Sequence, residues 1–168
     1  MTHDPVTQRA PHKAVIMARG LGTRMRKAAV GVSLTAEQAS AAQAGVKAMI
    51  SLDGRPFLDY VISSLADAGF DQFCLVIGPE HDLIRDYYDS CEKSRVEITY
   101  AIQEQPLGTA DAVAAAEHFA GDDRVLVVNS DNFYPEDAVA RLREVPASAT
   151  LGFTKRAMID QSNIDPER

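Results

Sequence analysis

The sequence is poor in cysteine and has no long apolar run. Its two cysteines, Cys74 and Cys91, match neither the ligand spacing of a metal site nor a disulfide framework, so we expect a reducing, cytoplasmic environment. No apolar stretch reaches the length needed to cross a bilayer, and the N-terminal residues lack the apolar core of a signal peptide. These absences argue against a membrane or secreted protein and favour one soluble globular domain.

An excess of positive charge is also absent. The net charge of −7 over 168 residues argues against general binding to nucleic acid. Six of the 17 Lys and Arg residues nevertheless lie in residues 1–27, where Asp4 is the only acidic residue. A basic segment on an acidic protein suits a small polyanion, and a solvated basic N-terminus explains the same charge equally well.

Short apolar runs alternate with helical periodicities along the chain. The runs predict strands at 14–18, 73–77, 96–102, 125–128 and 150–154. Between them, apolar residues recur at helical spacing around 57–65, 83–91, 109–119 and 135–142. This order predicts an α/β fold, a three-layer α/β/α Rossmann-like arrangement with a mainly parallel sheet. We expect residues 1–12 to form a disordered lead and residues 13–168 to form one domain, with an alanine-rich insertion or flap at 27–46.

The first predicted strand runs into a glycine-rich turn that carries Gly20, Gly22 and Arg24. Open α/β sheets bind ligands at the carboxyl ends of their strands, and glycine lets the backbone approach a phosphate closely. Arg24 adds a planar donor fork suited to phosphate oxygens. The turn is not a dinucleotide fingerprint, because Met25 stands where the third glycine would be, and the P-loop pattern is absent. Taken alone, the turn favours a purely structural role.

Two later segments place polar residues directly after predicted strands. Gln103 offers a donor and an acceptor together, which suits a pyrimidine edge, and Gly108 and Thr109 then begin a helix whose free N–H groups suit a polar ligand. Asp131 follows the most apolar strand, where a carboxylate can hold Mg²⁺ on a phosphate. An ordinary loop and a turn-shaping Asp are the alternatives for these segments.

Together these motifs resemble the nucleotidyltransferases that activate sugar 1-phosphates, including the thymidylyl- and uridylyltransferases. The family pattern opens with a strand and L-A-x-G-x-G-T-R-M, followed by a Pro-Lys pair, G-x-P-hydrophobic, Q-x-x-x-x-G-T-A and a strand that ends in G-D or S-D. The matching segments here are Met17 to Met25, Val46-Lys47, Gly54 to Phe57, Gln103 to Ala110 and Val125 to Asp131. The resemblance covers residues 13 to about 154, and it implies an enzyme that uses an NTP (dTTP or UTP), a sugar 1-phosphate and Mg²⁺, and releases pyrophosphate.

The resemblance also implies a role for each matching residue. Arg24 would bind the β and γ phosphates, Lys47 the α phosphate, and Asp131 the Mg²⁺ ion. Gln103 would read the base, in a pocket closed by Gly108 and Thr109. The remaining positions implied to contact the nucleotide are Met17, Ala18, Arg19, Gly20, Gly22, Thr23 and Ser130. The nucleophile would be the ionised phosphate oxygen of the substrate, so the chemistry would need no protein base and would rely on positioning and electrostatics.

Several positions depart from the family pattern. Arg19 replaces a small residue, Val46 replaces the proline before Lys47, and the second metal carboxylate and the sugar-binding residues find no match in the final segment. We therefore expect the C-terminal part of the domain to be missing from this sequence. Two alternatives stay open: a non-catalytic nucleotide-binding or regulatory module of the same fold, and a cofactor-type transferase acting on molybdopterin or phosphocholine. The oligomeric state is open too, a homo-oligomer included.

Overall fold

A computed structural model of the chain describes residues 10–20 and 47–161. Residues 1–9, the insertion at 27–46 and the site candidates Gly22, Thr23 and Arg24 lie outside the described residues. Pro11 and His12 belong to the segment predicted to be a disordered lead, but their carbonyl groups accept hydrogen bonds from the domain. The carbonyl of His12 accepts the N–H groups of Asp71 and Gln72 at 3.1 and 3.2 Å. The domain thus includes residues that precede the first strand.

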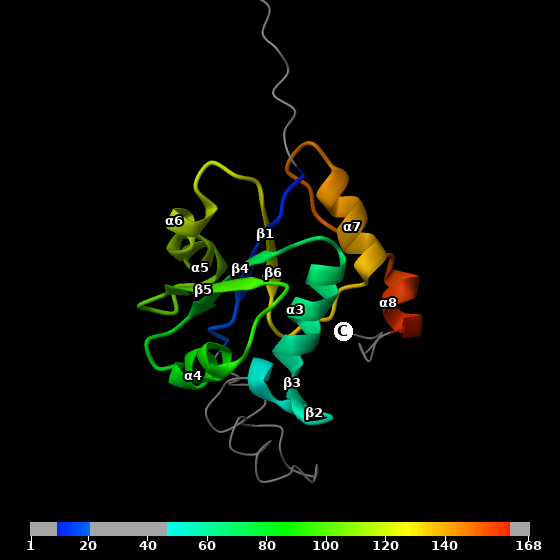
Figure 1. Cartoon of the computed structure of the whole chain (residues 1–168). Coiled ribbons are helices and arrows are strands. Elements are labelled where there is room, and N and C mark those ends of the chain that lie inside the picture. Colours follow the sequence, from blue (N-terminus) through cyan, green and yellow to red (C-terminus); the bar gives the residue numbers. More distant parts are fainter. Residues whose placement is uncertain (1–9, 21–46, 162–168) are drawn as a thin grey trace, which may run out of the picture.

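A parallel four-stranded sheet forms the centre of the molecule (Figure 1). Its strands are β1 (Lys13–Met17), β4 (Gln72–Ile77), β5 (Glu97–Ile102) and β6 (Val125–Asn129), in the order β5-β4-β1-β6. β1 pairs with β4 on one side and with β6 on the other, so that Ile16 lies opposite Leu75 and Val128. These four strands confirm four of the five predicted strands, and the mainly parallel sheet is confirmed with them.

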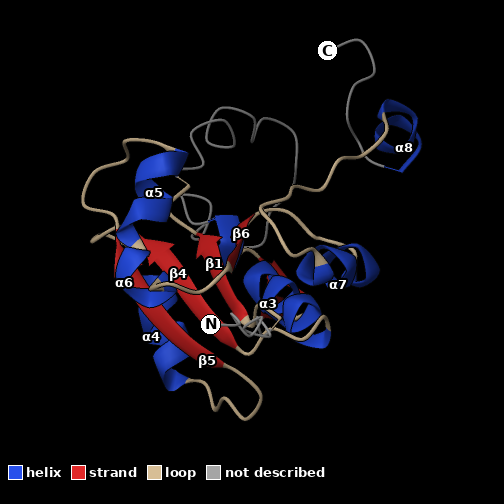
Figure 2. Ribbon diagram, turned by 90° about the horizontal axis from the view of Figure 1, so that it is seen from above, coloured by secondary structure: helices blue, strands red, loops and turns tan. Residues whose placement is uncertain are grey.

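Successive residues of the strands point to opposite faces of the sheet, and helices cover both faces. On one face Ala14, Ile16 and Phe73 pack in the core with residues of α3 (Phe57–Asp67), α4 (Asp82–Ser90) and α7 (Glu136–Glu144). On the other, Val15 and Cys74 pack against α5 (Thr109–Ala115) and residues next to α6 (Glu117–Ala120). Figure 2 shows α3 and α7 on one side of the sheet, with α5 and α6 on the other. The three-layer prediction is therefore confirmed.

Two helical predictions need correction. The helix expected over 109–119 is divided at Ala116 into α5 and α6, where the backbone has φ −90° and ψ 8° and no longer follows the α-helix. A further helix, α8 (Lys155–Gln161), begins where the sequence analysis expected no element. In the described part of the chain, no helix is long and apolar enough to cross a membrane.

A short hairpin connects the residues around Lys47 to α3. It follows the single 3₁₀ turn η1 (Lys47–Met49) and consists of β2 (Ser51–Leu52) and β3 (Arg55–Pro56). Asp53 and Gly54 form its two-residue turn with φ values of 49° and 80°, the positive values that an Asp-Gly hairpin turn adopts. Because η1 also buries Ala48 and Met49, Lys47 stands on an anchored turn.

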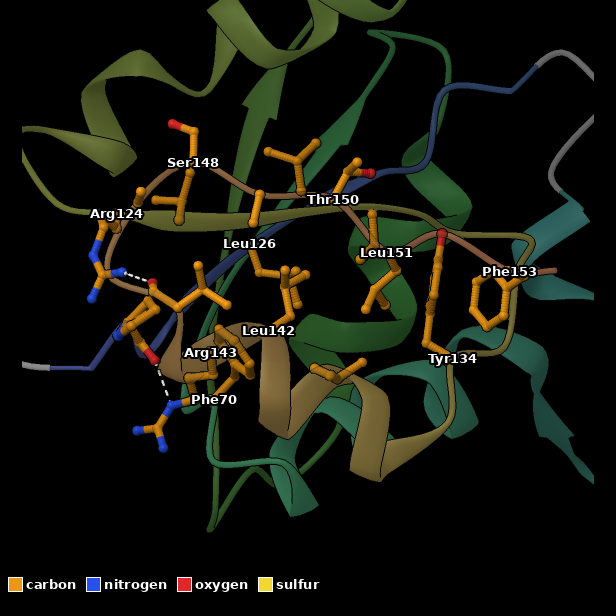
Figure 3. Close-up of a pocket in the computed structure, with 18 residues that line it drawn as sticks. Phe70, Arg124, Leu126, Tyr134, Leu142, Arg143, Ser148, Thr150, Leu151 and Phe153 are labelled. Carbon is orange, nitrogen blue, oxygen red and sulfur yellow. Dashed lines mark hydrogen bonds between the residues drawn. The ribbon is translucent and has the colours of Figure 1, made fainter.

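The fifth predicted strand, at 150–154, is wrong. These residues have no strand conformation, and in the described part of the chain no strand pairs with the second edge of β6. A strand needs a ladder of backbone hydrogen bonds, which local propensity does not supply. The segment instead lines a pocket of about 420 Å³ with β6 and α7, and Figure 3 labels Thr150, Leu151 and Phe153 among the lining residues.

Candidate nucleotide site

The topology of the sheet marks one place for a ligand. From β1 the chain winds outward through β4 to β5 and then returns to the other side of β1 for β6. The winding direction therefore changes between β1 and β6, and open α/β sheets bind ligands in the crevice that forms at the carboxyl ends of such strands. This edge carries the residues after Met17 on one strand and those after Asn129 on the other.

A pocket of about 320 Å³ lies at this edge. It is lined by Met17, Ala18, Arg19, Gly20, Lys47, Ala48, Gln103, Pro106, Gly108, Thr109, Ala112, Asn129, Ser130 and Asp131. Every site residue proposed from the sequence that lies in the described part of the chain is among them. Four further residues line the pocket and were not predicted from the sequence: Ala48, Pro106, Ala112 and Asn129. Only their nearness to the motifs in the sequence could have indicated them.

Backbone hydrogen bonds of the sheet continue into the floor of the pocket. The N–H of Ala18 donates to the carbonyl of Val76 at 2.8 Å, and the N–H of Ser130 donates to the carbonyl of Met17 at 3.2 Å. Ser130 is 7% exposed and is therefore buried in this floor. In the described structure, no atom stands within 4 Å of the place that a Cβ on Gly20 would take, which leaves that backbone open to a ligand.

Lys47 and Asp131 face each other across the pocket. The Lys47 Nζ atom lies 3.9 Å from Asp131 Oδ2, and the two side chains are 30% and 49% exposed. Both residues also line an adjoining hollow of about 290 Å³, together with Ile50, Leu52 and Phe57. The ammonium and the carboxylate therefore belong to residues that line both spaces.

Arg19 is already engaged by protein oxygens. Its guanidinium donates to the carbonyls of Gln103 and Glu104 and forms an ion pair with Glu80 at 3.4 Å. The side chain is 9% exposed. Arg19 thus joins the loops that follow β1, β4 and β5, and its charge is already paired with protein oxygens.

Glu80 and the adjacent His81 have shifted acidities. A hydrogen bond from its own backbone N–H, with a further contribution from the charge of Arg19, lowers the pKa of Glu80. Burial lowers the pKa of His81, whose side chain is 1% exposed and whose Nδ1 accepts the N–H of Gly78 at 3.1 Å. A neutral His81 therefore holds the loop after β4, against which Arg19 rests.

Gln103 has a buried side chain, 4% exposed, at the end of β5. Its Nε2 donates to the carbonyl of Gly108 at 3.1 Å and to Asp111 Oδ2 at 2.7 Å. Gly108 has φ +107° and ψ −174°, a conformation open to glycine and strained for other residues. Asp111 was missed by the sequence analysis; its place in the first turn of a helix was the one signal that could have indicated it.

The apolar pocket beside β6 is less suited to a charged ligand. Its two arginines already donate to backbone carbonyls, Arg124 to Val145 and Arg143 Nε to Pro11 at 2.6 Å, as the dashed lines in Figure 3 show. The pocket at the carboxyl ends of β1 and β6 is therefore the better candidate for a nucleotide.

Comparison with known proteins shows which family the chain resembles. The chain is 30% identical over 125 residues to the D-glycero-alpha-D-manno-heptose 1-phosphate guanylyltransferase of Aneurinibacillus thermoaerophilus, covering 74% of this chain and 48% of that protein. It is 32% identical over 141 residues to the UTP–glucose-1-phosphate uridylyltransferase AglF of Haloferax volcanii, covering 83% and 52%. A UTP-bound UGPase from Acinetobacter baumannii has a similar structure, with a TM-score of 0.59, 26% identity, and coverage of 72% of this chain and 46% of that one.

The chain therefore spans about half the length of these two curated relatives. The family model described as nucleotidyl transferase matches residues 13–158, which include β1, β6 and the whole described pocket. Sequence, fold and pocket agree, and this chain belongs to the nucleotidyl transferase family.

Proposed function

We propose that this chain supplies the nucleotide-binding half of an enzyme that transfers a nucleoside monophosphate from an NTP to a sugar 1-phosphate and releases pyrophosphate. The observation that supports this most strongly is the meeting of Lys47 Nζ and Asp131 Oδ2, 3.9 Å apart, in the pocket formed by the loop after β1. A cation and a carboxylate brought together from distant parts of the chain suit a triphosphate and its counter-ion.

Lys47 would stabilise the α phosphate during the reaction. In-line attack by a phosphate oxygen of the acceptor concentrates negative charge at the transferred phosphorus, and a fixed ammonium stabilises that charge without reorganising. Lys47 lines both the pocket and the adjoining hollow, which would give the donor nucleotide and the attacking phosphate separate spaces beside it. The acceptor oxygen is already ionised, so the protein's task is to position it. Arg24, outside the described residues, would bind the departing phosphates, as its motif implies.

Asp131 fits a magnesium ion that a nucleotide brings with it. The described residues hold no group of three or more His, Cys, Asp or Glu side chains that could form a complete metal cage. Mg²⁺ in nucleotide sites is commonly held by one or two carboxylates together with phosphates and water, and one part-exposed carboxylate at the end of β6 meets that requirement. When bound, the ion would neutralise charge on the phosphates.

Gln103 would read the base, with Gly108 and Thr109 beside it. We favour UTP or dTTP, because a glutamine at this place suits a pyrimidine edge. One relative described above is named for a uridylyl transfer and another for a guanylyl transfer, so GTP belongs in any test of the base.

A non-catalytic nucleotide-binding module is the second candidate. The coverage of about half of each relative supports it, because residues that hold the acceptor would come from the other half. Both candidates require a nucleotide in this pocket, and they differ in whether pyrophosphate is released.

Binding and turnover separate the two candidates. We would titrate the chain with each NTP in the presence of Mg²⁺, and then add a panel of sugar 1-phosphates and measure pyrophosphate. We expect this chain to bind nucleotide and to turn over poorly, and a longer form that carries acceptor residues to release pyrophosphate. Release by neither form with any acceptor would favour the binding module, and failure of every NTP to bind would refute both.

A further inference from the structure

The amide of Gln103 has one orientation in this structure. Its backbone N–H donates to the carbonyl of Ile77 at 2.8 Å, which fixes the residue at the end of the sheet. Both hydrogen-bond partners of Nε2, the carbonyl of Gly108 and the carboxylate of Asp111, are acceptors that cannot donate. A primary amide has two N–H groups, and these two contacts use both. Nε2 is therefore directed toward α5, and Oε1 is left as the polar atom that Gln103 can offer to a ligand.

We propose that Asp111 is a positioning residue for base recognition. It does not line the pocket, whereas Gln103 does, so it would act on a nucleotide through the amide. The inference rests on the proposed function, in which Gln103 reads the base, and adds that Asp111 limits Gln103 to the role of acceptor.

Asp111 contributes more to this orientation than Gly108 does. Its contact with Nε2 is the shorter of the two, 2.7 Å against 3.1 Å, and an ionised acceptor makes a stronger hydrogen bond than a carbonyl. Asp111 also lies in the first turn of α5, where a negative charge is favourable. A reversed amide would direct Oε1 at that carboxylate, so the charge of Asp111 opposes the flipped form directly.

An acceptor-only glutamine selects a class of base. Uracil, thymine and guanine carry a ring N–H next to a carbonyl, and this N–H can donate to Oε1. Cytosine and adenine carry a ring nitrogen with a lone pair at the corresponding place, which would face Oε1 without a proton between them. A buried polar pair left unsatisfied in this way lowers affinity, and a site built for one hydrogen bond rejects ligands that lack it.

Removal of the Asp111 carboxylate tests the inference. We would measure the affinity of the whole chain for UTP, dTTP, GTP, CTP and ATP with Mg²⁺, in the wild type and in Asp111→Ala, Asp111→Asn and Glu117→Ala. Glu117 is an exposed acidic residue at the start of α6 that does not line the pocket, and serves as the matched control. Asp111→Asn keeps an oxygen that can accept from Nε2.

We expect the wild type to bind the three nucleotides with a ring N–H more tightly than CTP and ATP. In Asp111→Ala the ratio of UTP to CTP affinity should fall about tenfold, the size of one hydrogen bond, because the amide becomes free to turn. Asp111→Asn should give an intermediate ratio, because its amide can accept from Nε2 or donate to a flipped Oε1, and Glu117→Ala should leave the ratio unchanged. If Asp111→Ala does not fold, Asp111→Ser keeps a residue suited to a helix start and carries the same prediction.

Each contrary result has a distinct meaning. An unchanged ratio in Asp111→Ala, with nucleotide binding that still depends on Lys47, would overturn the inference and leave the proposed function standing. A uniform loss of affinity for all five nucleotides would show that Asp111 serves the fold alone, and would also overturn it. Failure of the wild type to bind any nucleotide would overturn the proposed function, and the inference with it.

Discussion

Replacement of Lys47 by alanine should weaken nucleotide binding strongly and change stability little. Its ion pair with Asp131 spans 3.9 Å between side chains that are 30% and 49% exposed. Coulomb's law assigns such a pair about 1 kcal/mol in water and about 4 kcal/mol at an effective dielectric constant of about 20. Solvent screening and the entropy of two part-exposed side chains reduce the net value to about 0–1 kcal/mol. The free energy of unfolding should therefore fall by less than about 1 kcal/mol, which shifts Tm by at most a few degrees.

The effect on binding has a different size. A triphosphate replaces one carboxylate oxygen with several anionic oxygens, and a hydrogen bond to a charged group contributes about 1.5–3 kcal/mol. We therefore expect Kd for UTP with Mg²⁺ to rise about 10- to 100-fold in Lys47→Ala. Titration calorimetry measures Kd, and thermal unfolding of the free protein measures the stability. Lys155, exposed on α8 and outside the pocket, provides the matched control Lys155→Ala.

The two measurements together can refute the reasoning. A Tm lowered by ten degrees or more with an unchanged Kd would show that Lys47 holds the fold and does not contact a phosphate. An equal rise of Kd in Lys155→Ala would mean that net charge, rather than the position of Lys47, governs the binding.

Three further predictions concern other residues of the site and its surroundings. Asp131→Asn should weaken NTP binding when Mg²⁺ is present and leave NTP binding equal or stronger in EDTA. The reason is that the carboxylate of the wild type would attract the ion and repel phosphates that carry no ion. A loss of affinity of the same size in both buffers would contradict this prediction. Gly108→Ala should lower the free energy of unfolding, measured in urea, by about 1–3 kcal/mol, because the φ of Gly108 is +107°. Gly20→Ala should leave that free energy nearly unchanged and should impair nucleotide binding. Equal stability of the two variants would contradict the predicted backbone strain at position 108. Burial lowers the pKa of His81 in the folded state, so at a pH below about 6.5, the ordinary pKa of His, the unfolded chain binds more protons than the folded one. The stability that neutral His81 contributes is present above that pH and is lost as the pH falls through it. The urea midpoint of unfolding should therefore fall between pH 7.5 and 5.5, and His81→Asn should reduce this pH dependence.

Local signals predicted most of the architecture. Apolar runs of strand length and stripes at helical spacing identified β1, β4, β5, β6 and the helices between them, because the central strands are buried between two helical layers and each helix packs one face on the sheet. The wrong strand at 150–154 shows the limit of these signals, since a strand also requires a paired backbone that no local pattern can supply. The break between α5 and α6 is a similar case, because alanine at position 116 is compatible with a continuous helix and tertiary packing decides otherwise.

The sequence by itself determined which residues stand at the edge of the sheet. Gly20, Gln103 and Asp131 each follow an apolar run, and parallel strands carry whatever follows them to one common edge. The tertiary structure decided what those residues meet: Lys47 comes to 3.9 Å from Asp131, and Arg19 is bound by oxygens of other loops. It also turned the amide of Gln103 toward Asp111. Periodicity and spacing report which way a segment faces, whereas these contacts depend on side-chain geometry between segments that are far apart in the chain.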